Sequence, residues 1–146
     1  RPSDAFMAWQ KFSQTTDVFD IGFLIQSATI TELTEAEVAA YDAPFPDDSY
    51  KAGARIFPSL VPTSPDDPAA DANREAWKVF QQWDKPLICC FSDSDPVTAG
   101  GDAAFRKLVP GAQDRPKVTV ENAHHFFQED APDQLAQIVV DAVANG

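Results

Sequence analysis

The sequence has few of the residues that would indicate disulfides, metals or nucleic acids. Its 146 residues include 2 cysteines, 2 histidines and 1 methionine, and 23 acidic residues outnumber 11 basic ones. The formal net charge of −12 disfavours nucleic-acid backbones and anionic membranes as partners, because such a surface repels both. No apolar run approaches the roughly 20 residues of a membrane span, and the first residues lack the features of a signal peptide. We therefore expect a small neutral substrate or another protein as the partner.

The two cysteines are adjacent, Cys89 and Cys90 in LICCF, and neighbouring Cα atoms lie too close for an ordinary disulfide. In a strand, alternation would point the two side chains to opposite faces. We interpret both as reduced, buried and structural, which favours a cytoplasmic protein. A vicinal redox pair is the functional alternative.

The first half of the chain has a helical pattern. Hydrophobic residues make up 44% of the sequence, enough for one domain with an apolar core. From residue 3 to residue 67 the apolar positions recur at helical spacing in short segments that Pro and Asp interrupt. The expected helices are one marked by Phe6, Trp9 and Phe12, one capped by Asp17, one opened by the TEAE capping box at Thr34, and one over residues 48–56. The stretch VPTSPDDP, residues 61–68, indicates a domain junction.

The second half alternates between helices and strands. The predicted elements are a helix over residues 72–83, the strand PLICCF, a helix carrying Phe105 and Leu108, the strand KVTVE, and a final helix with Pro132 in its first turn. Two such strand-turn-helix units predict a parallel sheet. Because two strands alone make a poor sheet, we expect upstream residues or another chain to complete it. An unpaired strand edge would favour self-association.

Polar turns follow both predicted strands, SDSDPVT after the first and ENAHHFF after the second. Because the carboxyl ends of parallel strands share one edge of a sheet, an Asp and a His from these turns can meet. A carboxylate bonded to one imidazole nitrogen leaves the other nitrogen free to act as a base. Asp before His is also the order found in hydrolase triads whose nucleophile comes first. From position alone, catalytic and structural interpretations remain about equally open.

Longer segments carry a more specific pattern, namely FSDSDPVTAGGD, AHHFFQED and YDAPFPDDSYKAGARIFPSLVPTSPDDP. Together they resemble the C-terminal half of a haloalkane dehalogenase of the α/β-hydrolase superfamily, and the resemblance covers essentially the whole chain. It implies an α/β class, with a partial α/β-hydrolase fold. A helical cap, residues 1–67, would precede the last β-α units of a parallel sheet, residues 68–146. The nucleophile and the oxyanion hole would then lie upstream of Arg1.

The resemblance assigns the catalytic acid to Asp95 and the catalytic base to His125. The family usually has Ala-Gly-His-Phe where this chain has AHHF, so His124 occupies a glycine position. We expect crowding or a backbone adjustment there, with His124 as a solvated loop side chain. Asp93 is the alternative acid, although we interpret it as a turn residue.

Trp9, in AFMAWQKF, resembles the cap tryptophan whose indole N–H binds the leaving halide. Without the resemblance, Trp9 would be interpreted as a core aromatic. An indole suits halide binding because it is only a donor and its apolar body excludes water. The resemblance also places Phe6, Phe57, Pro58 and Val61 in the wall of the substrate pocket, although each alone could be ordinary core.

The implied reaction is hydrolysis of a carbon–halogen bond. An upstream aspartate would attack the carbon, release the halide and form an alkyl ester. His125, oriented by Asp95, would then deprotonate a water that hydrolyses the ester to an alcohol. The implied partners are a small halogenated hydrocarbon, water and a halide ion. No metal, organic cofactor, nucleic acid or membrane is implied.

Three other functions fit parts of the pattern. An epoxide hydrolase would use a similar Asp and His, and would activate its substrate with cap tyrosines, for which Tyr41 and Tyr50 are the candidates. An esterase would need an upstream serine. A chain that truly begins at Arg1 would be an inactive remnant or one side of a self-associating structure.

Overall fold

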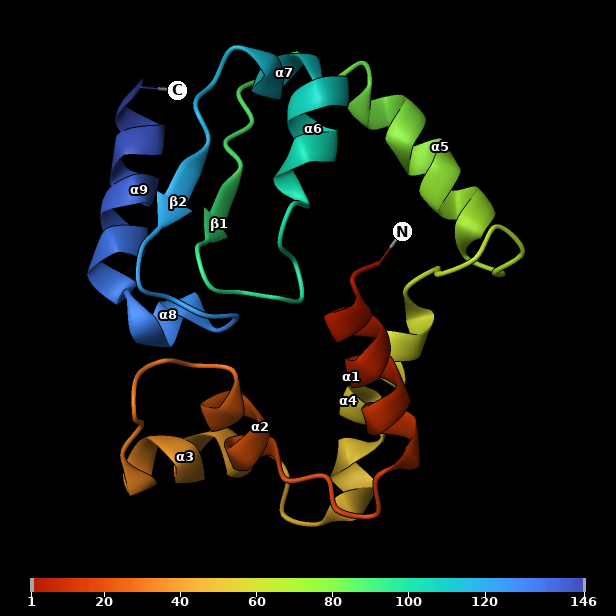
Figure 1. Cartoon of the computed structure of the whole chain (residues 1–146), viewed down its shortest axis with the longest axis vertical. Helices are drawn as coiled ribbons and strands as arrows, with labels where there is room; N and C mark the ends of the chain where they lie inside the picture. Colours follow the sequence, from red (N-terminus) through yellow and green to blue (C-terminus); the bar gives the residue numbers. More distant parts are fainter. Residues whose placement is uncertain (1, 146) are drawn as a thin grey trace.

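The computed structural model describes residues 2–145. Figure 1 shows that helices α1 to α4 gather in one part, whereas the two strands lie among the later helices in the other part. The first part contains α1 (Asp4–Thr15), α2 (Ile21–Ser27), α3 (Glu35–Asp42), the 3-10 turn Asp48–Lys51, α4 (Ala52–Ile56) and the 3-10 turn Phe57–Leu60. The second contains α5 (Ala70–Phe80), β1 (Cys90–Ser92), α6 (Asp102–Leu108), α7 (Pro110–Gln113), β2 (Val118–Val120), α8 (Phe127–Asp130) and α9 (Pro132–Asn145).

Two helices begin at side-chain caps. Ser3 caps α1, and its Oγ accepts a hydrogen bond from the Phe6 N–H at 3.1 Å. Thr34 opens α3 with the predicted capping box. Its Oγ1 accepts from the Glu37 N–H at 3.3 Å, and Glu37 accepts from the Thr34 N–H at 2.7 Å. Each cap satisfies amides that the first helical turn leaves without partners.

The predicted cap of α2 is wrong by three residues. Asp20, not Asp17, accepts from the Phe23 N–H at 2.8 Å, and α2 begins at Ile21. The prediction counted Val18 as part of the helical apolar stripe. Val18 instead precedes the helix and is 73% exposed.

The two strands pair in parallel, with Ser92 opposite Val120 and Cys90 opposite Val118. The apolar run that predicts the first strand, residues 86–91, is longer than β1 and starts before it. A run of apolar residues indicates that a segment is buried, but a strand also needs a hydrogen-bonded partner. Strand β2 pairs with only three residues of the run and its continuation, Cys90 to Ser92. The parallel pairing itself is confirmed.

Helices cover both faces of the strand pair. On one face, buried Cys89 packs with Val109 and Ala112, and the cluster includes side chains of α5 and α6. On the other, Cys90 packs against buried Val120 beside α8 and α9. The predicted alternation of the two cysteines is therefore confirmed, and both thiols are free. Burial raises the pKa of both thiols, which keeps them protonated and weakly reactive.

Phe19 forms the centre of the packing between α1 and α4. It is 2% exposed, and the rings of Trp9 and Phe12 stack on it with centroids at 5.9 and 6.5 Å. The guanidinium of Arg55 lies 4.7 Å from the Phe19 centroid and donates to the Thr16 carbonyl at 2.9 Å. This packing holds Trp9 in a fixed orientation.

Hydrogen bonds join the two parts of the chain. The Ser3 hydroxyl donates to the Val97 carbonyl at 2.8 Å, beyond the end of β1. The Phe126 N–H donates to the Ala28 carbonyl at 3.1 Å, beyond the end of β2. Helices α1 and α2 are therefore attached at the carboxyl edge of the strand pair.

Part of the apolar surface remains exposed. On α9, the side chains of Val139, Val140 and Val143 are 54, 59 and 82% exposed. Within residues 2–145, β1 pairs with β2 and with no further strand. No helix within residues 2–145 is long and apolar enough to cross a membrane. The exposed face and the free strand edge are surfaces on which another element of structure can pack.

Gly111 gives a direct test of the packing beside β1. A Cβ at this position would lie 1.8 Å from the Lys85 carbonyl oxygen, whereas a Cβ on Gly53 meets nothing within 4 Å. We expect Gly111→Ala to lower the free energy of unfolding by about 3 kcal/mol because the backbone must move. Gly53→Ala, inside α4, should instead raise it by about 0.5 kcal/mol. Urea denaturation of both variants measures these changes, and equal effects would contradict the packing described.

Candidate active site

Asp95 lies in the turn directly beyond β1 and is 6% exposed. Its carboxylate accepts hydrogen bonds from the N–H groups of Val97, at 2.7 Å, and Thr98, at 3.3 Å, and from the Thr98 hydroxyl. Burial raises the pKa of Asp95, but the hydrogen bonds from Thr98, His125 and Val97 together lower it below its usual value. Asp95 is therefore a buried carboxylate that stays ionised at neutral pH.

His125 lies in the loop beyond β2, and its Nδ1 is 3.0 Å from Oδ2 of Asp95. Because Asp95 is ionised, it acts as an acceptor, which assigns the imidazole proton to Nδ1 and leaves Nε2 as an acceptor. The His125 side chain is 34% exposed, so the ring is held by Asp95 without being enclosed. The structure thus brings together the two residues predicted to be the acid and the base.

His125 and Trp9 line the same cavity. This cavity has a volume of about 190 Å³ and a mostly apolar wall. Its lining residues are Trp9, Leu24, Ser27, Ala28, Val97, His125 and Phe126. Among the described residues, none accepts a hydrogen bond from the Trp9 indole N–H. The arrangement places an indole and an imidazole in mostly apolar surroundings.

The other predicted pocket residues lie elsewhere. Phe6, Phe57, Pro58 and Val61 are not among the residues that line this cavity. Phe57 is 72% exposed and Val61 is 39% exposed, whereas Pro58 is buried. Phe6 is half-buried in the first turn of α1. Their assignment to the substrate pocket stays a prediction, because the side chains present here do not enclose one around them.

His124 differs from the expectation of a solvated side chain. Its Nδ1 is buried and has no hydrogen-bond partner among the described residues. His124 does not adopt a positive φ, because the only non-glycine residue with positive φ in residues 2–145 is Asn122, at 55°. Asn tolerates this left-handed conformation better than most residues. The chain therefore makes its turn two residues before His124.

Asp93 has a different role from that of an alternative acid. Its carboxylate accepts from the N–H groups of Asn122, at 2.9 Å, and Ala123, at 3.2 Å. The hydrogen bond from the Asn122 N–H is the main reason that the pKa of Asp93 lies below its usual value. Asp93 thus holds the backbone of the loop that carries His125. The interpretation of Asp93 as a turn residue did not include this contact with the second loop.

Two further residues of the site were missed by the sequence reasoning. The Thr98 hydroxyl donates to Asp95. The spacing Asp-x-x-Thr in SDPVT is the signal that could have identified Thr98, because side chains in such turns often bond groups a few residues away. Asp130 accepts from the N–H of His124 at 2.8 Å and from two amides of the segment after α2. No pattern along the chain indicates the contacts of Asp130 with Ile30 and Thr31, because these two residues are far away in sequence.

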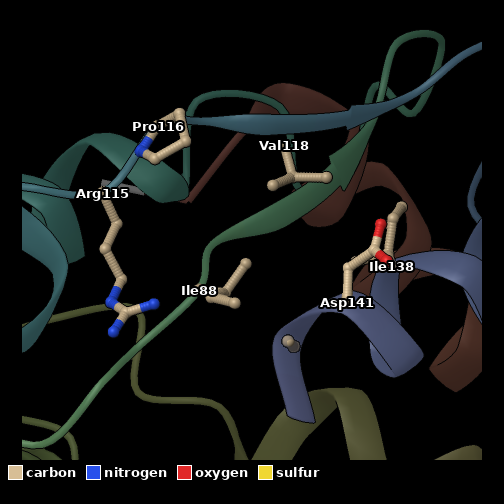
Figure 2. Close-up of a pocket in the computed structure, with 7 residues that line it drawn as sticks. Ile88, Arg115, Pro116, Val118, Ile138 and Asp141 are labelled. Carbon is tan, nitrogen blue, oxygen red and sulfur yellow. The ribbon is translucent and has the colours of Figure 1, made fainter. Parts of the chain in front are cut away.

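A larger cavity, of about 230 Å³, lies at the opposite end of the strands. Figure 2 shows that Ile88, before β1, and Val118, in β2, face Ile138 and Asp141 of α9. Arg115 lies at the side of this cavity. Ile88 precedes β1 and Arg115 precedes β2, so this cavity is at the amino ends of the strands. Ligands of open α/β sheets bind at the carboxyl ends. We therefore assign the chemistry to the cavity that His125 lines.

The part of the chain that the structure describes offers no set of side chains that could bind a metal ion. Residues 2–145 contain no group of three or more His, Cys, Asp and Glu side chains placed to hold a metal ion.

Comparison with known proteins reveals close relatives. No family model matches the chain. A haloalkane dehalogenase of Psychrobacter cryohalolentis is 50% identical over 137 residues, which cover 94% of this chain and 45% of that protein. A haloalkane dehalogenase of Mycobacterium marinum is 44% identical over 140 residues, covering 96% of this chain and 47% of that protein. The chain spans about half the length of these curated relatives.

Solved structures give the same result for the fold. The tetrameric structure of a haloalkane dehalogenase from Paraglaciecola agarilytica superposes with a TM-score of 0.82 and 25% identity, covering 100% of this chain and 48% of that one. A haloalkane dehalogenase from Bradyrhizobium elkani gives a TM-score of 0.73 at 19% identity, covering 98% of this chain and 53% of that one. The chain is thus homologous to haloalkane dehalogenases over nearly its whole length, and it has part of the α/β-hydrolase fold.

The lowered pKa of Asp95 predicts how its contribution to stability depends on pH. A carboxylate whose pKa is lower in the folded state adds stability above its unfolded pKa of about 3.9, and this stability is lost as the pH falls through the folded value. We expect Asp95→Asn to destabilise the protein most above pH 5, with a smaller loss below pH 4. Urea denaturation between pH 7 and pH 3 measures this, with exposed Asp84→Asn as the control. A loss of the same size at every pH would contradict the assignment.

Proposed function

We propose that this chain is the cap and C-terminal part of a haloalkane dehalogenase, which hydrolyses a carbon–halogen bond to an alcohol and a halide. In this proposal residues 1–67 form the helical cap and residues 68–146 belong to the main domain. The observation that carries the proposal is that Trp9 and His125 line one apolar cavity while Asp95 holds the His125 ring. The homology over 94% of the chain supports it.

The nucleophile is an aspartate in the half of the protein that this chain does not span. Its carboxylate attacks the carbon that bears the halogen, the carbon–halogen bond breaks, and an alkyl ester forms. The halide leaves toward the indole N–H of Trp9, a donor in apolar surroundings. The cavity wall beside Trp9 exposes little polar surface, so water competes weakly for the halide.

His125 serves the second step. With its proton on Nδ1 bonded to Asp95, its Nε2 accepts a proton from a water molecule that attacks the ester carbonyl. The ester bond breaks, the alcohol leaves and the aspartate is restored. Asp95 stabilises the imidazolium that forms meanwhile, because its low pKa keeps it ionised. No step uses a metal or an organic cofactor.

The placement of the two tyrosines disfavours epoxide hydrolysis. The Tyr41 hydroxyl donates to the Glu129 carboxylate, and Tyr41 lines a different cavity, with Glu37 and Glu129. Tyr50 is 61% exposed. Neither lies beside His125, where a hydroxyl would have to meet the epoxide oxygen.

The remaining partners and the location follow from the same proposal. The substrate is a small haloalkane, and water and the halide ion are the other reactants. The free edge of β1 is where the upstream half completes the sheet, or where a chain without that half self-associates. Two free cysteines with raised pKa values suit a reducing compartment such as the cytoplasm.

Trapping of the ester tests the role of His125. In the protein that joins this chain to its upstream half, we expect His125→Ala to release about one halide per enzyme and then stop, because the second step lacks its base. Intact-protein mass spectrometry should show the added alkyl group. Steady turnover by His125→Ala would contradict the proposal. We expect the 146-residue chain alone to release no halide, since it lacks the nucleophile.

Substitution of Trp9 tests the role of the indole. We expect Trp9→Phe to slow the first step by about 100-fold, since a donor to the developing charge is lost while an aromatic ring remains. The matched control is Trp83→Phe, because Trp83 lies beyond α5, away from this cavity. Stopped-flow measurement of halide release compares the two variants. An unchanged first step in Trp9→Phe, with epoxide turnover lost in Tyr41→Phe, would favour the epoxide hydrolase instead.

A further inference from the structure

We propose that Asp130 is a positioning residue that couples the segment after α2 to the loop that carries His125. This inference rests on the proposed function for its catalytic consequence. Oδ1 of Asp130 accepts from the N–H groups of Ile30 and Thr31, each at 2.8 Å. Oδ2 accepts from the N–H of His124, also at 2.8 Å. We call these three hydrogen bonds the Asp130 bridge.

The Asp130 bridge uses both oxygens of one half-buried carboxylate and reaches two segments about a hundred residues apart. Burial raises the pKa of Asp130, but the N–H groups that it binds, with those of Thr31 and His124 foremost, lower it below its usual value. The carboxylate therefore keeps its charge, and charge-assisted hydrogen bonds to N–H groups are the stronger kind. A neutral side chain of the same shape would not replace it.

The bridge acts directly on both sides of the cavity. On one side, the N–H of His124 belongs to the residue before the base, so its bond restricts how His125 presents its ring to Asp95. On the other side, Ile30 and Thr31 follow Ala28, which lines the cavity with His125. Movement of the segment after α2 is thereby transmitted to His125.

A second contact lies parallel to the bridge. The Phe126 N–H donates to the Ala28 carbonyl at 3.1 Å, so the residues before and after His125 are both bound to the segment 28–31. His125 is thus held from both sides of its own backbone. Asp93 holds the loop earlier, where its carboxylate accepts from the N–H groups of Asn122 and Ala123. Coupling between the two segments depends on Asp130 and not on Asp93.

The isosteric change Asp130→Asn replaces one carboxylate oxygen with an NH₂ group. Whichever way the amide turns, that NH₂ faces the N–H of His124 or those of Ile30 and Thr31, and two donors cannot bond. We expect amide hydrogen exchange at the residues that lose their bond, either His124 or both Ile30 and Thr31, to become at least about tenfold faster, because one protein hydrogen bond is worth roughly that factor. Asp133→Asn, which removes the same charge from an exposed site at the start of α9, should leave these rates unchanged.

The readout for positioning is the imidazole itself. In the protein with its upstream half, we expect the His125 Nδ1–H proton resonance to shift toward that of Asp95→Asn when Asp130 becomes Asn. We also expect hydrolysis of the ester to slow by about tenfold while formation of the ester stays within about twofold, since only the second step uses His125. Asp130→Glu keeps the charge, but its longer side chain displaces the carboxylate, so we expect both signals to change in the same direction by a smaller amount.

The outcomes separate the two proposals. If Asp130→Asn leaves the His125 resonance unchanged while the amides that lose their bond exchange faster, the residue is structural only and the inference is overturned. If the unsubstituted protein forms no alkyl ester, the proposed function fails, and the imidazole resonance still decides whether Asp130 positions the ring. If Asp130→Asn does not fold, Asp130→Glu takes its place, because a longer side chain also displaces the bridge. An unchanged resonance in a folded Asp130→Glu with faster amide exchange overturns the inference as well.

Discussion

The parallel register of β1 and β2 is the constraint on which the site depends. Ser92 lies opposite Val120, so the chain leaves both strands at the same edge, with Asp95 three residues beyond one strand and His125 five residues beyond the other. A shift in this register would separate the carboxylate from the imidazole. Helices on both faces fix the register, because Cys89 and Cys90 pack into different clusters.

The loop after β2 is held almost entirely by side chains. The N–H of Glu121 bonds to Oε1 of Gln134 at 3.1 Å, and those of the next two residues bond to Asp93. The N–H of His124 bonds to Asp130. Four consecutive amides thus lack backbone partners and are satisfied by three polar side chains from different parts of the chain. This explains part of the acidic composition, since some of the carboxylates bind backbone and do not face solvent.

The sequence predicted the features that depend on local chemistry. The capping box at Thr34 follows from contacts within one turn, and the Asp95 and His125 pairing follows from the rule for parallel strands. The catalytic roles of that pair were assigned by resemblance and stay predictions.

What the sequence did not predict depends on distant contacts. Asp17 and Asp20 are both plausible caps, and only the burial of Phe19 decides between them. The buried ring nitrogen of His124 and the contacts of Asp130 depend on segments that the fold brings together. Phe57 was assigned to a pocket wall from resemblance; it is exposed in this chain, and the assignment stays a prediction. Local patterns therefore predicted the pairing of Asp95 with His125 but not the side chains that hold the two residues.

The hydrogen bonds of Asp130 also bear on the order in which the molecule folds. Each capped helix can form from neighbouring residues, whereas the bond from Ile30 to Asp130 closes a loop of 100 residues and that from Ser3 to Val97 one of 94. The entropy of closing such loops must be overcome before these bonds contribute to stability. We therefore expect helices and strand pairing to precede the alignment of His125 with the cavity. The geometry of the site is then among the last features to form, and chains caught partway through folding would contain helices in which Asp95 and His125 are not yet paired.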